Sequence, residues 1–139
     1  MSASTKLSTA VKAICFLTRV YPKPKTSSEI SDYVGVNASK IRKILSMLVK
    51  NNIVESTYGP AGGFLIKKKP DEIHLQEIYC AIEDRKAFHL DVTKKNGGGL
   101  NNNSNLNFFF LDLFAEIQID IEDKMKQISI QSILNKINS

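Results

Sequence analysis

Apolar residues recur every three or four positions over most of this chain, the spacing with which a helix buries one face. The pattern predicts helices over residues 6–20, 26–34, 38–52, 70–83 and 108–128, and a short last helix over 130–137 that Ser129 caps. Two prolines in YPKPK, residues 21–25, end the first helix. Thr26 and Glu29 have the spacing of a capping box, and Gly35 suits a helix end.

A β-hairpin is predicted between the third and fourth helices. Two short runs, IVEST at 53–57 and FLIKK at 64–68, flank a tip that contains GPAGG. Glycine allows backbone angles that other residues avoid, so it suits a tight tip that approaches a surface closely. The predicted fold is mostly α with a small β-hairpin wing (α+β), a winged helix-turn-helix with a long C-terminal helix.

The helix predicted at 38–52 has two contrasting faces. One face is apolar and the other is basic, and no acid lies between Asp32 and Glu55. Solvated helix faces normally mix both charge signs, so this pattern favours contact with nucleic acid over a merely solvated lysine face, which stays the alternative. The polar face carries Ser39, Lys40, Arg42, Lys43, Ser46 and Lys50.

Charge is divided unevenly along the 139 residues, whose net charge is +5. Residues 1–70 hold 12 Lys or Arg and 3 Asp or Glu, whereas residues 71–139 hold 7 and 11. A basic front half favours a polyanionic partner such as double-stranded DNA.

Three segments are expected. Residues 1–84 would form the DNA-binding domain, residues 85–107 a flexible loop rich in glycine and asparagine, and residues 108–139 a dimerisation helix with a short C-terminal helix. The long helix has more apolar surface than a small domain can cover, which predicts a homodimer; packing on its own first helix is the alternative. The predicted contact residues are Phe110, Leu113, Phe114, Ile117 and Ile121.

Several function classes fit poorly. Two histidines, no nucleophile motif and no phosphate-binding GxxxxGK[ST] argue against an enzyme. No apolar run is long enough to cross a bilayer, and the polar start lacks the core of a signal peptide, so a cytoplasmic protein is expected. Cys15 lies on an apolar stripe and is expected to be structural. Cys80 lies off its stripe and is a candidate thiol sensor.

The chain resembles the Rrf2 family of winged-helix regulators, which includes IscR, NsrR and CymR. The resemblance rests on LSTAVKAICFL, on SSEISDYVGVNASKIRKILSMLVKNNIV, on GPAGGF, on PDEIHLQEIYCAIE and on the tail SIQSILNKI, which together span almost the whole chain. Among family members it looks most like the short YwnA type.

The resemblance implies a homodimeric transcription regulator, usually a repressor, whose third helix enters the major groove and whose wing reaches the minor groove. Family members often have arginine before the wing glycines, where this chain has Tyr58, which would stack or bond a phosphate instead. The implied DNA-binding residues are Ser28, Asn37, Ala38, Ser39, Lys40, Arg42, Lys43, Thr57, Tyr58, Gly59, Pro60, Ala61, Gly62 and Gly63. A winged-helix protein-interaction module that has lost specific DNA binding is the alternative function.

No cofactor is expected. Cluster-binding relatives carry three cysteines between the fourth helix and the long helix, but residues 84–107 contain none here. His89 alone is no metal site, so neither an iron–sulfur cluster nor another metal is predicted. The effector is left open between oxidation at Cys80 and a small molecule, for which a pocket between the domain and the long helix is one location.

Overall fold

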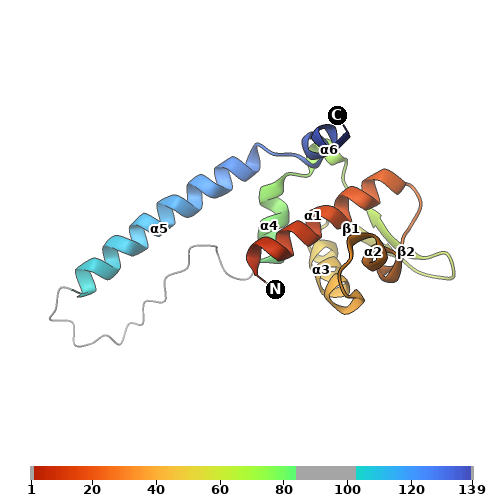
Figure 1. The fold of residues 1–139 in the computed structure, drawn as a ribbon, viewed down its shortest axis with the longest axis horizontal. Helices are drawn as coiled ribbons and strands as arrows, with labels where there is room; N and C mark the ends of the chain where they lie inside the picture. The colour runs from red at the N-terminus through yellow and green to blue at the C-terminus, as the bar shows by residue number, and fades with distance from the viewer. Residues whose placement is uncertain (1, 84–102, 139) are drawn as a thin grey trace.

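The computed structural model describes residues 2–83 and 103–138. Six helices, one 3-10 turn and one hairpin follow each other in the described ranges (Figure 1). In chain order they are α1 (Ala3–Val20), α2 (Ser27–Val34), α3 (Ala38–Lys50), β1 (Val54–Thr57), β2 (Gly63–Ile66), η1 (Pro70–Glu72), α4 (Leu75–Ile82), α5 (Asn103–Lys126) and α6 (Ile130–Asn138). The expected fold, mostly helical with a small hairpin, is confirmed.

The first three helices follow their local signals. Thr26 Oγ1 accepts a hydrogen bond from the N–H of Glu29, and the Glu29 carboxylate accepts one from the N–H of Thr26, which completes the predicted capping box. The Thr26 backbone bond lowers the pKa of Glu29. Gly35 ends α2 in the left-handed conformation, with φ at 79°. α1 begins at Ala3, three residues earlier than predicted, because Ser2 caps it by accepting from the N–H of Thr5.

The hairpin is antiparallel, and the segment after α1 pairs with the outer edge of its second strand. Val54 pairs with Ile66 at its base and Thr57 pairs with Gly63 near its tip. The N–H of Lys25 donates to the Phe64 carbonyl at 3.1 Å, and the N–H of Phe64 donates to the Lys25 carbonyl at 2.7 Å. The segment after α1 therefore acts as a one-residue third strand that anchors the wing.

This anchor explains the last wing glycine. A Cβ atom built on Gly63 would lie 2.6 Å from the Lys25 carbonyl oxygen, closer than real Cβ contacts. A Cβ atom on Gly62 would lie closer still to the Thr57 carbonyl oxygen. Both glycines are thus required by close approach within the chain itself.

We expect Gly63→Ala to lower the free energy of unfolding by about 2 kcal/mol, because the wing must separate from Lys25 to accommodate the methyl group. Urea unfolding followed by circular dichroism measures this change. Ala61→Ser, an exposed change at the same tip, is the control and should stay within about 0.5 kcal/mol of the wild type. Equal stability of the two variants would contradict the steric role of Gly63.

One predicted helix is wrong in its first part. Instead of a continuous helix over residues 70–83, a 3-10 turn precedes an extended Ile73, and α4 begins only at Leu75. The reason is pairing with the link between α5 and α6. The N–H of Ile130 donates to the Ile73 carbonyl at 2.8 Å, and the N–H of Leu75 donates to the Ile128 carbonyl at 2.8 Å. These long-range bonds replace the helical ones.

The core lies between the helices of the winged domain. Fully buried residues from α1, α2, α3, the hairpin and α4 form one cluster, which Ile130 and Leu134 of α6 join. The predicted segment 108–139 therefore divides in the structure, because α6 packs on the domain body while α5 extends away from it (Figure 1). The largest fully buried side chains include Ile14, Leu17, Ile30, Ile41, Leu45, Leu48, Ile53, Ile78 and Ile82.

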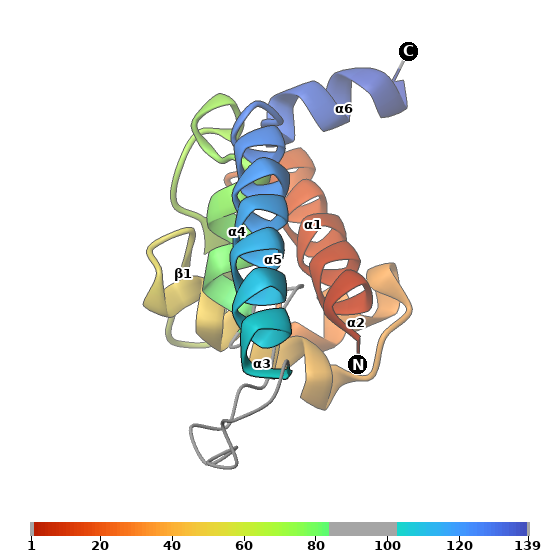
Figure 2. The same cartoon turned by 90° about the vertical axis from the view of Figure 1, so that its left-hand side faces the viewer.

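α5 contacts the body through α4. Figure 2 shows α5 overlying α4 when the molecule is viewed from the α5 side. At this contact, Gln118 Nε2 donates to Tyr79 Oη at 3.3 Å and to Glu122 Oε2 at 3.0 Å. The helix starts five residues earlier than predicted, so residues 103–107 of the predicted loop are helical. The rest of that loop, together with His89, lies outside the described residues.

Candidate nucleic-acid interface

α3 presents the predicted basic face to solvent. Ile41, Ile44, Leu45 and Leu48 are buried, and this apolar face fixes the helix on the core. Every predicted polar residue of the opposite face is exposed: Ser39, Lys40, Arg42, Lys43, Ser46 and Lys50. In the part of the chain that the structure describes, none of the basic residues of α3 forms an ion pair with an acid. Their charges are free to meet an anionic partner.

Asn37 is the N-cap residue of α3. Its Oδ1 accepts from the N–H of Ser39 at 2.8 Å and from Ser39 Oγ at 2.6 Å, which caps the helix. A bidentate contact to adenine needs both the oxygen and the nitrogen of the amide. Asn37 would have to leave the cap to make it, so a base contact from Arg42 is the more accessible one.

Ser28 lies at the start of α2, which precedes α3 in the helix-turn-helix. It is exposed in the first turn of α2, beside the Thr26 cap. Backbone N–H groups at a helix start attract phosphate oxygens. This position is compatible with Ser28 as a DNA-binding residue, and that role stays a prediction.

The predicted wing residues fall into two groups. Tyr58, Gly59, Pro60 and Ala61 are exposed, and Tyr58 is 93% accessible. Thr57 belongs to the hairpin instead, since its Oγ1 accepts from the N–H of Gly63 at 3.1 Å. Gly62 and Gly63 are required by the close contacts described above. The exposed tip is therefore the part of the wing that is able to reach a partner.

Sequence reasoning missed the part played by Lys25. Its backbone holds the wing through Phe64, and its ammonium group lies 3.4 Å from the Glu29 carboxylate and 6.0 Å from the centre of the Phe16 ring. The local signal was the pair of prolines: Pro22 lies in the turn that follows α1, and Pro24 immediately precedes the extended Lys25.

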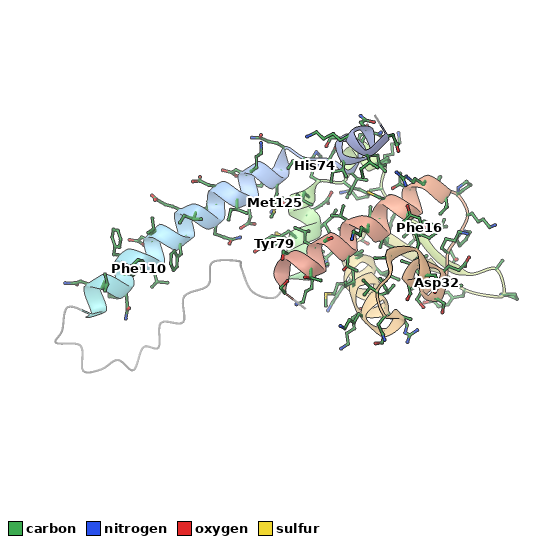
Figure 3. All side chains as sticks on the ribbon, in the orientation of Figure 1. Phe16, Asp32, His74, Tyr79, Phe110 and Met125 are labelled. Atoms are coloured by element: carbon green, nitrogen blue, oxygen red, sulfur yellow. The ribbon has the colours of Figure 1, made fainter. Side chains whose placement is uncertain are left out.

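The predicted dimer residues lie on the projecting helix. Phe110, Leu113, Phe114, Ile117 and Ile121 are all half-buried in the single chain. Larger exposed surface comes from their neighbours Phe108, Phe109 and Ile119, with Phe109 59% accessible. Gln118 is the one buried residue of α5 among those with described side chains. Figure 3 places Phe110 on the part of α5 that is far from the body.

The two cysteines differ as predicted in exposure. Cys15 is buried in the core, and burial raises the pKa of its thiol, an effect that Arg19 partly offsets. Cys80 is exposed on α4. Its Sγ lies 3.2 Å from Gln76 Nε2 and 3.5 Å from Glu122 Oε1, so the thiol takes part in the polar contact between α4 and α5. Its use as a sensor stays a prediction.

We expect a thiol reagent such as Ellman's reagent to modify one cysteine per native chain quickly and both cysteines in denaturant. Access to the sulfur governs thiol reactivity: Cys80 is exposed, whereas Cys15 is buried and its pKa is raised by that burial. Cys80→Ser should abolish the fast reaction, whereas Cys15→Ala should keep it. Fast labelling of two thiols in the native protein would contradict the burial of Cys15.

Within the described ranges, no group of three or more His, Cys, Asp or Glu residues gathers as a metal site. No helix in the same ranges combines the length and the apolar character that a membrane span needs.

Comparison with known proteins identifies the family. The model of the Rrf2 family, described as iron-dependent transcriptional regulators, matches residues 3–136. The HTH-type transcriptional regulator YwnA of Bacillus subtilis is 30% identical over 129 residues, which cover 90% of this chain and 93% of YwnA. The HTH-type transcriptional regulator IscR of Escherichia coli is 32% identical over 76 residues, 55% of this chain and 44% of IscR.

Solved structures share the fold. IscR of T. potens superposes with a TM-score of 0.70 over 99% of this chain and 88% of its own, at 18% identity. CymR, the global cysteine regulator of B. subtilis, superposes with a TM-score of 0.69 over 98% of each chain, at 14% identity. With its exposed basic helix, its hairpin wing and a family match along nearly its whole length, the chain belongs to the Rrf2 family of DNA-binding transcriptional regulators and is not an enzyme.

Proposed function

We propose that the protein is a repressor that binds a palindromic operator as a homodimer and acts in the cytoplasm, where bacterial DNA lies. The observation that carries the DNA-binding part is the face of α3. Lys40, Arg42 and Lys43 project from a helix whose other side is anchored in the core, and no acid within the described chain neutralises them. Such a rigid cationic ridge suits the major groove.

The tip of the wing would supply the second contact. Tyr58 is almost fully exposed and stands where an extended hairpin reaches beyond the body (Figure 1). Its hydroxyl would bond a phosphate, and Gly59, Pro60 and Ala61 would lie against the minor groove. Ser28 and Asn37 would border the helix contact, while Thr57, Gly62 and Gly63 hold the tip in shape.

A homodimer through α5 is proposed because this helix leaves phenylalanines in solvent. Phe108 and Phe109 are more than half exposed, although aromatic side chains dominate stable interfaces. A second copy that crosses α5 near Phe110 and Leu113 would cover them. Two-fold symmetry would then place two α3 helices toward half-sites about one helical turn apart or a multiple of it.

The experiment that tests this function is selection of genomic DNA fragments by the purified, reduced protein, followed by sequencing. We expect a few fragments that share an inverted repeat, and we expect one of these sites to overlap a promoter. Uniform recovery that disappears with salt would mean that only the backbone is bound. No recovery at low salt would favour the alternative, a winged-helix protein-interaction module.

We also propose that the chain works without an iron–sulfur cluster, although the family description is iron-dependent. The support is chemical, since residues 84–107 hold no cysteine and Cys15 is buried. Anaerobic incubation with ferrous iron and sulfide, followed by desalting, should leave no bound iron and no visible cluster absorption. Stoichiometric iron with such absorption would refute this proposal.

A further inference from the structure

A cavity of about 500 Å³ lies at the base of the wing, away from the predicted DNA-binding residues. Ile66 lines it at the end of the hairpin where Val54 pairs, whereas the exposed tip begins after Thr57 at the other end. The volume is within the range of pockets that hold small organic molecules. Sequence reasoning placed a pocket between the domain and α5, so this one is elsewhere.

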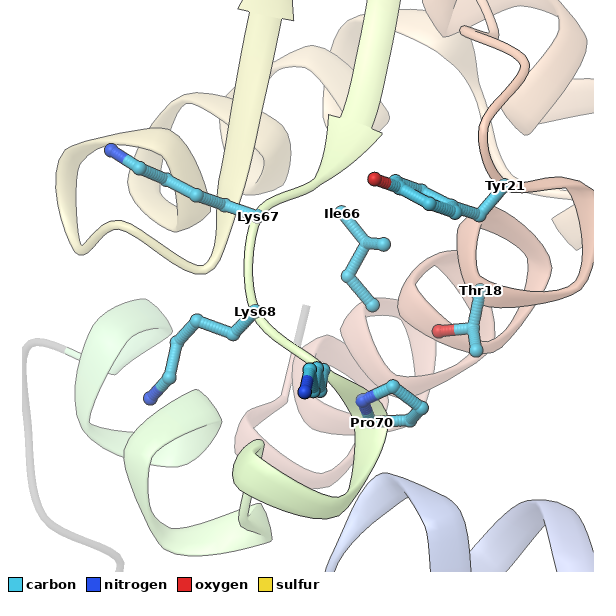
Figure 4. Close-up of a pocket in the computed structure, with 7 residues that line it drawn as sticks. Thr18, Tyr21, Ile66, Lys67, Lys68 and Pro70 are labelled. Atoms are coloured by element: carbon cyan, nitrogen blue, oxygen red, sulfur yellow. The ribbon is translucent and has the colours of Figure 1, made fainter.

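The floor and one wall of the cavity are apolar or aromatic. Figure 4 shows Tyr21 and Thr18 on one side, facing Ile66, with Pro70 below. Tyr21 is 58% exposed, so its ring is available to pack on a ligand. The hydroxyl proton of Thr18 already goes to the Ile14 carbonyl at 2.8 Å, so Thr18 is left as an acceptor.

The remaining wall carries three lysines, of which one is available to a ligand. Lys67 Nζ donates to Asn52 Oδ1 at 3.2 Å, and Lys68 Nζ lies 2.7 Å from the Glu77 carboxylate. Figure 4 shows both side chains directed away from Tyr21. Lys69 is exposed and has no ion pair or side-chain hydrogen bond within the described residues. Lys67 keeps its positive charge, since Asn52 is neutral, but its side chain is directed away from Tyr21. We therefore assign Lys69 as the cation that pairs with a ligand in the cavity.

Two carboxylates close to Lys69 in the chain limit which anions bind in the cavity. The exposed acids Asp71 and Glu72 follow Lys69 in the chain, and the N–H of Glu72 donates to the Lys69 carbonyl. A polyanion such as DNA would meet these carboxylates as well as the lysine, and the carboxylates would repel its phosphates. A ligand with a single negative group would reach Lys69 without approaching the two carboxylates.

We propose that this cavity binds a small organic anion with a flat apolar body, such as an aryl carboxylate. The ring would lie between Tyr21 and Ile66, and the carboxylate would pair with Lys69. This ligand would also regulate DNA binding, an inference that rests on the proposed function. Along the chain, Tyr21 precedes Lys25 by four positions and Ile66 follows Phe64 by two, so a ligand held by both would act on the Lys25–Phe64 bridge that anchors the wing.

The test is a titration of the full chain with 2-naphthoate, followed by amide NMR shifts. We expect saturable shifts at residues 18–21 and 66–70, with a dissociation constant on the order of 1 mM for a ligand of this size. Lys69→Gln should weaken naphthoate about fivefold and leave the neutral 2-naphthylmethanol unchanged. Tyr21→Ala should weaken both ligands, and Lys12→Gln, an exposed lysine of α1 that does not line the cavity, should weaken neither.

Three results would overturn the site. They are no saturable shift at these amides, equal naphthoate binding by Lys69→Gln, and shifts confined to the apolar surface of α5. Shifts at residues 66–70 on adding duplex DNA, with none on adding naphthoate, would assign the lysines to DNA instead.

The regulatory role has its own readout. Saturating naphthoate should change operator affinity about fivefold or more in the wild type. Arg42→Ala/Lys43→Ala should lose DNA binding and still bind naphthoate, which separates failure of the cavity from failure of the proposed function. Naphthoate binding with an unchanged operator affinity would keep the site and overturn its role in regulation.

Discussion

Phe109→Glu/Leu113→Glu should convert the proposed homodimer into a monomer. These residues lie one helical turn apart on α5, and Phe109 is exposed in the single chain. An aromatic anchor such as Phe109 contributes about 2 kcal/mol where it is a hot spot, and a buried carboxylate at either position adds a desolvation cost. Each change occurs twice in a symmetric dimer. We therefore expect the dimer dissociation constant to rise at least about 100-fold. Analytical ultracentrifugation over a range of concentrations measures it.

The control is Glu116→Ser, an exposed polar change on the same helix, which should stay dimeric. Circular dichroism should show the same helix content in both variants, since the core of the winged domain does not include Phe109 or Leu113. The monomeric variant should also lose most of its operator affinity, because two linked half-site contacts are stronger than one. A double variant that remains dimeric would show that α5 is not the interface.

Removing two charges from α3, in the variant Arg42→Ala/Lys43→Ala, should nearly abolish operator binding. A dimer would lose four cationic contacts, and each phosphate contact contributes about 0.9 to the slope of log affinity against log salt. If all four meet phosphates, the slope falls by about 3.6. If Arg42 contacts a base, its removal also lowers the preference for that base over the others by about 1–3 kcal/mol. Fluorescence anisotropy with the selected operator at several salt concentrations measures both effects.

The matched control is Lys124→Ala/Lys126→Ala in the last turn of α5, which removes the same charge far from α3 in the chain. It should leave the salt slope almost unchanged. Thermal unfolding should not change much in the α3 variant, because both side chains are exposed. An unaltered affinity and slope after the α3 substitutions would exclude this helix as the recognition helix.

Predictions that depended on near neighbours in the chain held well. The Thr26–Glu29 capping box joins residues three apart, and Gly35 ends α2 by its own backbone freedom. The stripe of Ile41, Leu45 and Leu48 determined which face of α3 is buried, and so which face presents its lysines. These features depend on a few adjacent residues, and the pattern of apolar positions records them directly.

The sequence-based predictions failed where segments that are distant in the chain come together. Ile73 leaves the helical conformation because its carbonyl pairs with Ile130, 57 positions later. The sequence also made no prediction of where α6 packs, and the structure buries its Ile130 and Leu134 in the body. No local signal near residue 73 distinguishes a helix start from an extended residue, since the partner that decides it is far away in the chain.

By itself, the sequence determined the order of the elements, the basic face of α3 and the absence of cysteine from residues 84–107. It did so because periodicity, caps and composition are local properties. Only the tertiary structure decided that Gly63 serves the Lys25 contact, that Asn37 is held in a cap, and that Tyr21, Ile66 and Lys69 surround one cavity. Each of these depends on where the folded backbone places a side chain, and spacing along the chain does not contain that information.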